Sequence, residues 1–299
     1  MKWTQRFPFK RRERCPFCLG QDFRPLLAYD DLKLWRCRCG YVFMNPFLSE
    51  EGSRLIFSSD PAQYFPWLED FERNLGAADS GTRGIKTFNR SLAFLEAARG
   101  AKPGRILDVG CGSGHFLEIA KKRGWRAEGL DLSPECVSRT HARTGLLVHL
   151  GRLEELHAAP YDALTLWDYF EHVEDPVQIL RTARALLNSG GMLVIACPHH
   201  GGLVFVAARI LHALSFGKIG KPVRLVYPPT HLSYFTPGFI KRAAAREGFK
   251  CERILFDETD LSRLHLPEVF KRLARIIFTL ARMAAMSNRF ILFLRKGES

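Results

Sequence analysis

A glycine-rich turn beside a carboxylate is the first feature of the sequence that could do chemistry. In the segment RILDVGCGSGHFLEIA, three glycines follow a short apolar run: Gly110, Gly112 and Gly114. Asp108 stands two residues before the first of them. Glycines between a strand and a helix let the backbone approach a ligand closely. A carboxylate here would repel the pyrophosphate of a dinucleotide and attract an ammonium group, such as the one that S-adenosylmethionine carries.

A second carboxylate, Asp131, follows the first glycine by about twenty residues, in the segment EGLDLSP. At the end of a strand it could accept hydrogen bonds from both ribose hydroxyls of an adenosine. The alternative is that Asp131 caps the helix beginning near Pro134. Taken with Asp108 and the glycines, it predicts S-adenosylmethionine as the cofactor.

Four of the eight cysteines lie near the start of the chain in two close pairs. Cys15 and Cys18 stand in CPFCLG, and Cys37 and Cys39 stand in WRCRCGYVF. The first pair has the C-x-x-C spacing of a structural zinc site, and the second pair would supply two more thiolates. The C-x-C spacing of the second pair departs from the usual knuckle. We expect one structural zinc ion, with free thiols as the alternative.

The order of apolar and polar segments predicts the elements that must position these residues. After a helix at 82–99, short apolar runs alternate with stretches of helical periodicity. We expect strands at 105–109, 127–132, 146–150, 163–167 and 192–197, and helices at 113–123, from 134, and at 175–187. This alternation predicts an α/β fold with a doubly wound, Rossmann-like parallel sheet.

The sequence further divides into three expected parts. Residues 1–48 would form a zinc-ribbon-like module, 49–81 a linker, and 82–299 the main domain, with inserted helical segments at about 201–226 and 262–288. A helix at 238–246 and strands at 251–256 and 290–294 complete the main domain. The stretch 268–286 has apolar residues on one helical face and basic residues largely on others. Its partner is either the chain's own sheet, a second subunit, or an anionic membrane surface.

The motifs ILDVGCGSG and WDYFEHVEDP resemble those of class I S-adenosylmethionine-dependent methyltransferases, over about residues 82–296. The second motif is similar to that of ubiquinone-biosynthesis O-methyltransferases and of many sugar and secondary-metabolite methyltransferases. The resemblance implies that Trp167 lies near the sulfonium and that Arg152 and Leu153 flank the adenine. It also implies cofactor contacts at Arg90, Cys111 and Leu132. For Arg90, a solvated arginine on the helix surface is an equal alternative.

Two histidines are candidates for the catalytic base. His172 lies in EHVEDP and His231 in the Pro-rich segment YPPTHLSYFTP. Methyl transfer needs mainly alignment of the acceptor and removal of its proton, so one base is enough. Both histidines have a purely structural role as the alternative. Asp168, Glu171 and His172 could instead hold a divalent ion, and Cys197 is interpreted as a buried residue rather than a nucleophile.

Composition narrows the function only in part. The formal net charge of +13 favours anionic partners, and the longest apolar stretch, 203–216, is too short to span a bilayer. A cytoplasmic protein is expected, peripheral at the membrane if the basic helix binds lipid. The leading function is methyl transfer to a small-molecule, sugar or lipid-linked glycan acceptor. RNA methylation is less favoured, because the Asn/Asp-Pro-Pro-aromatic motif is missing after the fourth strand, and a non-catalytic cofactor-binding protein is the third alternative.

Overall fold

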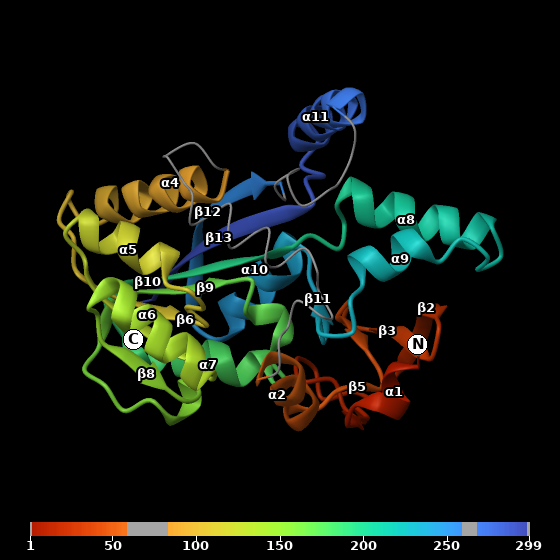
Figure 1. The fold of residues 1–299 in the computed structure, drawn as a ribbon, viewed down its shortest axis with the longest axis horizontal. Helices are drawn as coiled ribbons and strands as arrows, with labels where there is room; N and C mark the ends of the chain where they lie inside the picture. Colours follow the sequence, from red (N-terminus) through yellow and green to blue (C-terminus); the bar gives the residue numbers. More distant parts are fainter. Residues whose placement is uncertain (1, 59–82, 259–267, 298–299) are drawn as a thin grey trace.

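The structure, a computed structural model, describes residues 2–58, 83–258 and 268–297. A seven-stranded sheet lies at its centre (Figure 1). Its strands in chain order are β6 (Arg105–Val109), β7 (Arg126–Asp131), β8 (Val148–Leu150), β9 (Tyr161–Trp167), β10 (Leu187–Pro198), β12 (Phe249–Asp257) and β13 (Arg289–Lys296). In space the order is β12-β13-β10-β9-β6-β7-β8. The strands from β10 to β8 are parallel and β13 is antiparallel to both its neighbours, so the predicted doubly wound sheet is confirmed with one reversed strand.

Helices cover both faces of this sheet, because alternate residues of each buried strand point to opposite sides. Ile106 packs in the same hydrophobic cluster as Leu92, which lies on one face of the sheet, whereas its neighbour Leu107 packs with Leu180 on the other face. The first face carries α4 (Arg83–Ala97), α5 (His115–Lys122) and α6 (Pro134–Thr144), and the second carries α7 (Pro176–Leu186) and α10 (Pro237–Arg246). Two short 3-10 turns, η2 (Leu153–Glu155) and η3 (Phe170–His172), follow β8 and β9.

Three of these helices begin with a polar cap followed directly by proline. Ser133 accepts a hydrogen bond from the Cys136 N–H, Asp175 from those of Val177 and Gln178, and Thr236 from that of Phe239. A proline in the first helical turn loses nothing, because its missing N–H would have no intrahelical partner there. Ser133 therefore caps α6, and the alternative in which Asp131 is the cap is wrong.

The N-terminal residues form a smaller sheet that includes a distant piece of chain. The elements of the N-terminal part of the chain are α1 (Trp3–Arg6), β1 (Phe9–Lys10), β2 (Phe23–Tyr29), β3 (Leu32–Cys37), β4 (Val42–Met44), β5 (Phe47–Leu48) and α2 (Glu50–Ser58). The four-stranded order is β11-β4-β3-β2, where β11 (Ser233–Tyr234) comes from the segment between β10 and α10. The strands β1 and β5 pair separately.

The N-terminal module is packed as part of the main body. Cys15, Cys37 and Tyr41 belong to the same hydrophobic core as Leu107 of β6 and Phe235, which follows β11. The division expected at residue 48 stays a prediction, but the core crosses it. The segment expected to be a linker begins instead with α2, because Ile56 is buried in the N-terminal core. Residues 59–81 of that segment lie outside the described residues.

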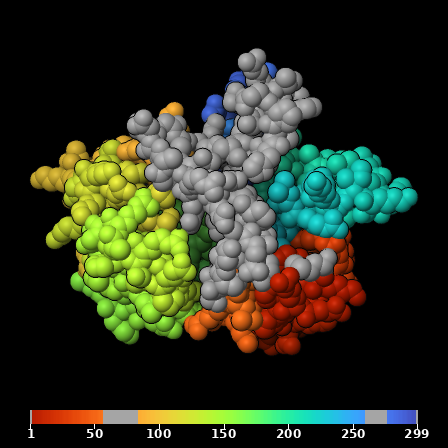
Figure 2. Space-filling model, in the orientation of Figure 1, coloured from red at the N-terminus to blue at the C-terminus, as the bar shows by residue number. Residues whose placement is uncertain are grey.

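Helices are present within both predicted inserted segments. They are α8 (Leu203–Leu214), α9 (Lys221–Val226) and α11 (Glu268–Met283). Residues 262–267 of the second segment lie outside the described residues. In Figure 1, α8 and α9 lie side by side at the end of the molecule that holds the N-terminal strands, and α11 projects from the sheet. The same two helices form the teal lobe at the right of the space-filling view (Figure 2). Among the described residues, no helix is both long and apolar enough to cross a membrane.

The shared core makes Phe235 a test of how firmly the two parts are joined. Its side chain is 1% exposed and packs against Phe170, with ring centroids 5.1 Å apart, and against Tyr41 at 6.0 Å. We expect Phe235→Ala to lower the free energy of unfolding by about 3–5 kcal/mol, measured by urea denaturation. The same truncation at Phe216, which is 92% exposed, should change it by no more than about 0.5 kcal/mol. Equal effects of the two truncations would contradict the shared core.

Candidate functional site

The glycine turn follows β6 at its carboxyl end, and the described residues leave space on one side of it. Gly110, Gly112 and Gly114 have φ values of 70°, 52° and 75°, in the left-handed region that glycine tolerates. A Cβ on Gly110 would stand 2.8 Å from a ring carbon of Tyr169, whereas no described residue has an atom within 4 Å of the corresponding position on Gly112. The Thr140 hydroxyl donates to the Gly112 carbonyl at 2.7 Å. The turn is thus fixed on one side by Thr140, and on the Gly112 side no described residue fills the space.

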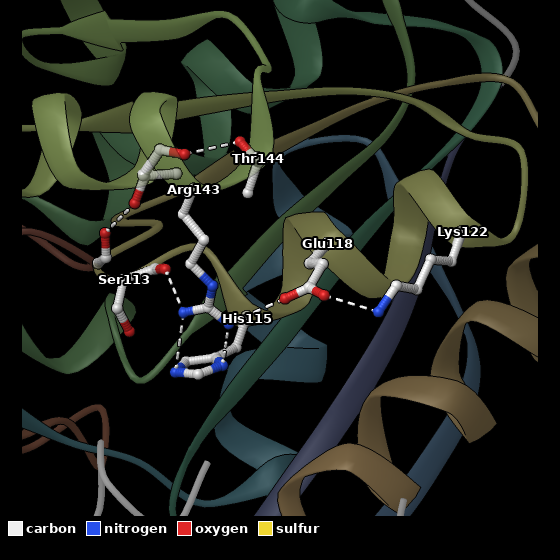
Figure 3. Close-up of polar contacts among 8 residues, drawn as sticks. Ser113, His115, Glu118, Lys122, Arg143 and Thr144 are labelled. Atoms are coloured by element: carbon white, nitrogen blue, oxygen red, sulfur yellow. Dashed lines mark hydrogen bonds and ion pairs between the residues drawn. The ribbon is translucent and has the colours of Figure 1, made fainter. Parts of the chain in front are cut away.

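Arg143 of α6 also braces this turn (Figure 3). It donates to the Ser113 carbonyl at 2.9 Å and pairs with Glu118 of α5 at 2.9 Å. His115 lies against the same guanidinium, 2.6 Å from Nδ1 to Arg143 Nη2. Burial and the Arg143 charge lower the pKa of His115 to about 4, so the imidazole is neutral and accepts this hydrogen bond. This brace could not be predicted from local sequence patterns, because it depends on the contact between α5 and α6.

Asp108 and Asp131 lie on neighbouring strands at this edge. Asp108 is 3% exposed and accepts a hydrogen bond from the Thr165 hydroxyl at 2.6 Å. Burial, with the nearby Asp131 charge, raises its pKa to about 8. Asp131 is half-buried and accepts from the N–H groups of Gly112 and Ser133, each at 2.9 Å. A carboxylate has about four lone-pair sites, so Asp131 keeps capacity for two ribose hydroxyls.

Two further predicted contacts lie beside the turn, and a third is placed on the surface. Trp167 ends β9, and its ring packs against Phe88 and Phe116, with centroids 4.9 and 5.4 Å away. Among the described residues its buried Nε1 has no hydrogen-bond partner. Leu132 follows β7 and is 44% exposed. Arg90 is exposed on α4, which fits a cofactor contact and a solvated arginine equally.

Three of the predicted cofactor contacts have side chains that are engaged within the protein. The Cys111 side chain packs in the core beside Gly129, and its N–H donates to the Leu130 carbonyl at 3.1 Å. Leu153 is completely buried, so it offers no surface to an adenine. Arg152 pairs with Glu50 of α2 at 2.6 Å and therefore holds the N-terminal segment. The sequence could not anticipate these roles, because each is decided by packing across the fold.

The two candidate bases are brought together with a buried carboxyl group. Glu171, His172 and His231 each present a ligand atom, and these atoms all lie within 4.8 Å of one another. The imidazole rings of the two histidines meet edge to face at 4.7 Å. The His172 Nδ1 lies 2.8 Å from the Thr230 carbonyl. Because a carbonyl only accepts, Nδ1 carries the proton and Nε2 keeps the lone pair when His172 is neutral.

Burial keeps this group uncharged. Burial lowers the pKa of His172. Burial, together with the repulsion that a proton on His172 would add and with the Arg289 charge, lowers the pKa of His231 well below its usual value. Burial and the neighbouring Asp168 raise the pKa of Glu171 well above its usual value. Both Glu171 carboxyl oxygens and the His231 Nδ1 are buried without a hydrogen-bond partner in the described part of the chain. Unsatisfied buried polar atoms are costly, so they indicate a ligand that would satisfy them.

The sequence predicts a metal group of Asp168, Glu171 and His172, and the structure replaces Asp168 by His231. Asp168 is engaged by Arg289 of β13, 2.6 Å from Oδ2 to Nη1, because the antiparallel pairing of β13 with β10 brings Arg289 to this edge. His231 takes its place among the atoms that could hold a divalent ion. Arg289 is not among the residues predicted for the site, although its place directly before the apolar run 290–294 puts it at the end of a predicted strand. Cys197 is completely buried, as interpreted.

The four N-terminal cysteines form a compact cluster. The sulfur atoms of Cys15 and Cys39 are 3.6 Å apart, those of Cys18 and Cys37 are 3.5 Å apart, and all four lie within 4.8 Å of one another. Four sulfurs bound tetrahedrally to zinc at about 2.3 Å would be about 3.8 Å apart. The donor set and its size therefore fit a structural zinc ion.

Comparison with known proteins agrees with this geometry. A family model described as a methyltransferase domain matches residues 83–254. The ubiquinone biosynthesis O-methyltransferase of Xanthomonas campestris pv. campestris is 33% identical over 142 residues, which cover 44% of this chain and 59% of that enzyme. The chain thus matches about three fifths of the length of that curated relative.

Two solved structures share the fold. The magnesium protoporphyrin IX methyltransferase of Synechocystis superposes with a TM-score of 0.55 at 16% identity, covering 82% of this chain and 98% of that one. A SAM-dependent methyltransferase of Archaeoglobus fulgidus gives a TM-score of 0.52 at 20% identity, covering 78% and 99%. Because the family model spans more than half of the sequence, the chain belongs to the methyltransferase-domain family, within the class I S-adenosylmethionine-dependent fold.

Proposed function

We propose that the chain transfers a methyl group from S-adenosylmethionine to a hydroxyl group of a small-molecule acceptor. The observation that carries this proposal is the meeting of two sites at one sheet edge. The glycine turn follows β6, and Trp167 and η3 stand at the end of the neighbouring parallel strand β9. Asp108 pairs with Thr165 in this register, so both segments leave the sheet at the same edge. The likeness to ubiquinone biosynthesis O-methyltransferases supports oxygen as the acceptor atom.

The residues at the turn suit the charges and hydroxyls of this cofactor. Asp108 would face the ammonium group, Asp131 the ribose, and the open space before Gly112 would admit the chain between them. The ring of Trp167 would offer an aromatic face to the sulfonium cation. S-adenosylmethionine supplies an activated methyl group, so the protein has to align the acceptor and remove its proton.

We assign proton removal to His231. His231 is neutral and half-buried, and its Nδ1 has no hydrogen-bond partner among the residues that the structure describes. Glu171, protonated by burial, can donate a hydrogen bond to a second oxygen of the acceptor. His172 is held by the Thr230 carbonyl and so fixes the segment that carries His231. Binding of a divalent ion by Glu171, His172 and His231 is the competing role for the same group.

We further propose that the cysteine cluster binds one structural zinc ion. The support is the donor set of four thiols and their spacing, given above. A closed site of four thiolates leaves no position for a substrate, so the ion would stabilise the fold without taking part in catalysis.

The helical pair α8–α9 supports an acceptor carried at an anionic lipid surface, such as a sugar on a lipid carrier. Its outer surface exposes Leu214, Phe216 and Leu225 at 75%, 92% and 62%. Lys218 and Lys221 are exposed between them, and no Asp or Glu occurs from residue 176 to 246. Each basic residue near an acidic membrane contributes about 1 kcal/mol of attraction. Because α8 follows β10 directly at the edge that holds the site, docking here would bring the site close to the lipid.

Cofactor affinity should depend on pH through Asp108. Its pKa of about 8 leaves it mostly protonated at neutral pH, whereas the cofactor ammonium requires the carboxylate. We expect affinity to rise close to tenfold per pH unit from about pH 6 to 7.5, with nearly one proton released on binding. Titration calorimetry in buffers of different ionisation enthalpy measures both. Asp108→Asn should bind weakly without proton release, and Asp30→Asn on the surface should behave as wild type; an affinity independent of pH would contradict the assignment.

Replacing His231 should impair turnover far more than cofactor binding. We expect His231→Ala to lower kcat by about 10²–10⁴-fold because the acceptor proton loses its base. S-adenosylmethionine affinity should stay within about twofold. His157→Ala, at an exposed histidine, is the matched control. A variant with near-normal kcat would exclude His231 as the base, and loss of a bound divalent ion together with activity would establish the metal role instead.

Membrane docking is tested by sedimentation with vesicles of acidic phospholipid. The wild type should sediment at low salt and be released at high salt, because screening weakens the attraction of the exposed lysines. Phe216→Asp should reduce binding by about tenfold or more, since it places a charge in the apolar surface. Leu147→Asp changes a residue that is 57% exposed outside α8–α9 and should have no effect. Protein that stays in the supernatant at low salt would exclude this surface.

A further inference from the structure

The segment 228–236 is held between the two sheets, and it carries His231. On one side β11 pairs with β4, with Ser233 opposite Phe43, and the Met44 N–H donates to the Leu232 carbonyl at 3.0 Å. On the other side the Leu232 N–H donates to the Glu171 carbonyl at 2.9 Å. The residue next to His231 therefore bridges the N-terminal sheet and η3 through its own peptide groups.

The second pair of cysteines sets the position of the strand that holds this segment. Cys37 donates its N–H to the Tyr41 carbonyl at 2.8 Å, closing the turn from which β4 begins. The Tyr41 hydroxyl forms a 2.5 Å hydrogen bond with the Ser233 hydroxyl, and both side chains are buried. The turn that bears Cys37 and Cys39 is thus two hydrogen bonds away from β11.

The first pair of cysteines packs on the same place. Phe17, which lies between Cys15 and Cys18, contacts Tyr41 and Phe239 edge-on at 4.9 and 4.8 Å. Phe239 follows the His231 segment at the start of α10. Both cysteine turns therefore meet at one aromatic cluster behind the segment. The Phe17–Tyr41 contact and a hydrogen bond from the Arg38 N–H to the Asp22 carbonyl at 3.2 Å already join them, and the four sulfurs add a link that a metal ion would make rigid.

We infer that metal binding by the four-cysteine cluster positions His231 for the acceptor, so that the metal state sets acceptor-site geometry without affecting the cofactor site. This inference rests on the proposed zinc ion and on the proposed role of His231. A bound ion fixes both turns, and its binding energy becomes local folding energy. The glycine turn is braced separately by Thr140 and Arg143 of α6. Loss of the ion should loosen β4, β11 and the His231 segment while the glycine turn stays in place.

The experiment compares the zinc-loaded full chain with the same chain stripped by mild chelation, with metal content measured in each. Hydrogen exchange read by mass spectrometry should become about tenfold faster in the peptide spanning 229–236. The peptide spanning 106–116 should not change, and S-adenosylhomocysteine affinity should stay within about twofold. Adding zinc back should restore slow exchange.

A matched pair of tyrosine variants covers the case in which the stripped chain unfolds. Tyr41→Phe removes the bond to Ser233 and leaves all four thiols, so it should speed exchange at 229–236 and lower kcat several-fold, with zinc content and KM for S-adenosylmethionine unchanged. Tyr161→Phe removes a buried hydroxyl that donates to Glu128 at 2.9 Å and should leave that peptide unchanged.

Three results would overturn the inference: a chain that carries no metal, exchange at 229–236 that is the same with and without metal, or an equal increase at 106–116. These measurements need no turnover. If exchange at 229–236 depends on metal but the chain transfers no methyl group, the proposed function is rejected and the link between the metal and the His231 segment still holds. If exchange does not depend on metal, that link is rejected whether or not the chain is active.

Discussion

The register between β6 and β9 is the constraint on which the site depends. Both strands are buried on two faces, so a slip by one residue would turn apolar side chains toward the wrong helix layer. With Asp108 opposite Thr165, the glycine turn after β6 and the residues after β9 emerge side by side. The contact expected between a Gly110 Cβ and Tyr169 shows how closely the two chain segments pass. The residues proposed to bind the cofactor and those proposed to contact the acceptor are therefore neighbours because of strand pairing, although they are far apart in the sequence.

Burial of ionisable groups is the second theme of this sheet edge. Asp108, Glu171 and Arg289 lie where water is largely excluded, and burial of such groups is costly unless they are paired or neutral. Arg289 is paired with Asp168, and Glu171 is neutral by its raised pKa. Apolar residues at this edge would avoid the desolvation penalty of the charged groups. Retaining these groups makes sense where a ligand brings complementary charges and hydroxyls, which is the situation that methyl transfer from a sulfonium to an oxygen requires.

The sequence predicted the elements well and their distant contacts poorly. The alternation of apolar and polar runs placed each strand of the main sheet to within a few residues, because burial on both faces leaves little freedom. The glycine turn and its acidic flank were read from local spacing alone. In contrast, β11 is two residues long and hidden in a Pro-rich stretch, so only its pairing with β4 defines it. The ion pair of Arg152 with α2 and the burial of Leu153 in the core could not be predicted for the same reason, since both are decided by the rest of the chain.

The pairing of β4 with β11 also has a consequence for synthesis of the chain. Tyr41 and Ser233, which join the two strands, are 192 residues apart. At typical translation rates β4 would leave the ribosome roughly 10–40 s before its partner exists. During that interval the small sheet has an unpaired edge, the kind of edge that invites association with other chains. The nascent N-terminus must therefore depend on early folding around its cysteines, or on a chaperone, to stay soluble, and the site that would accept a substrate is completed only when most of the protein has been made.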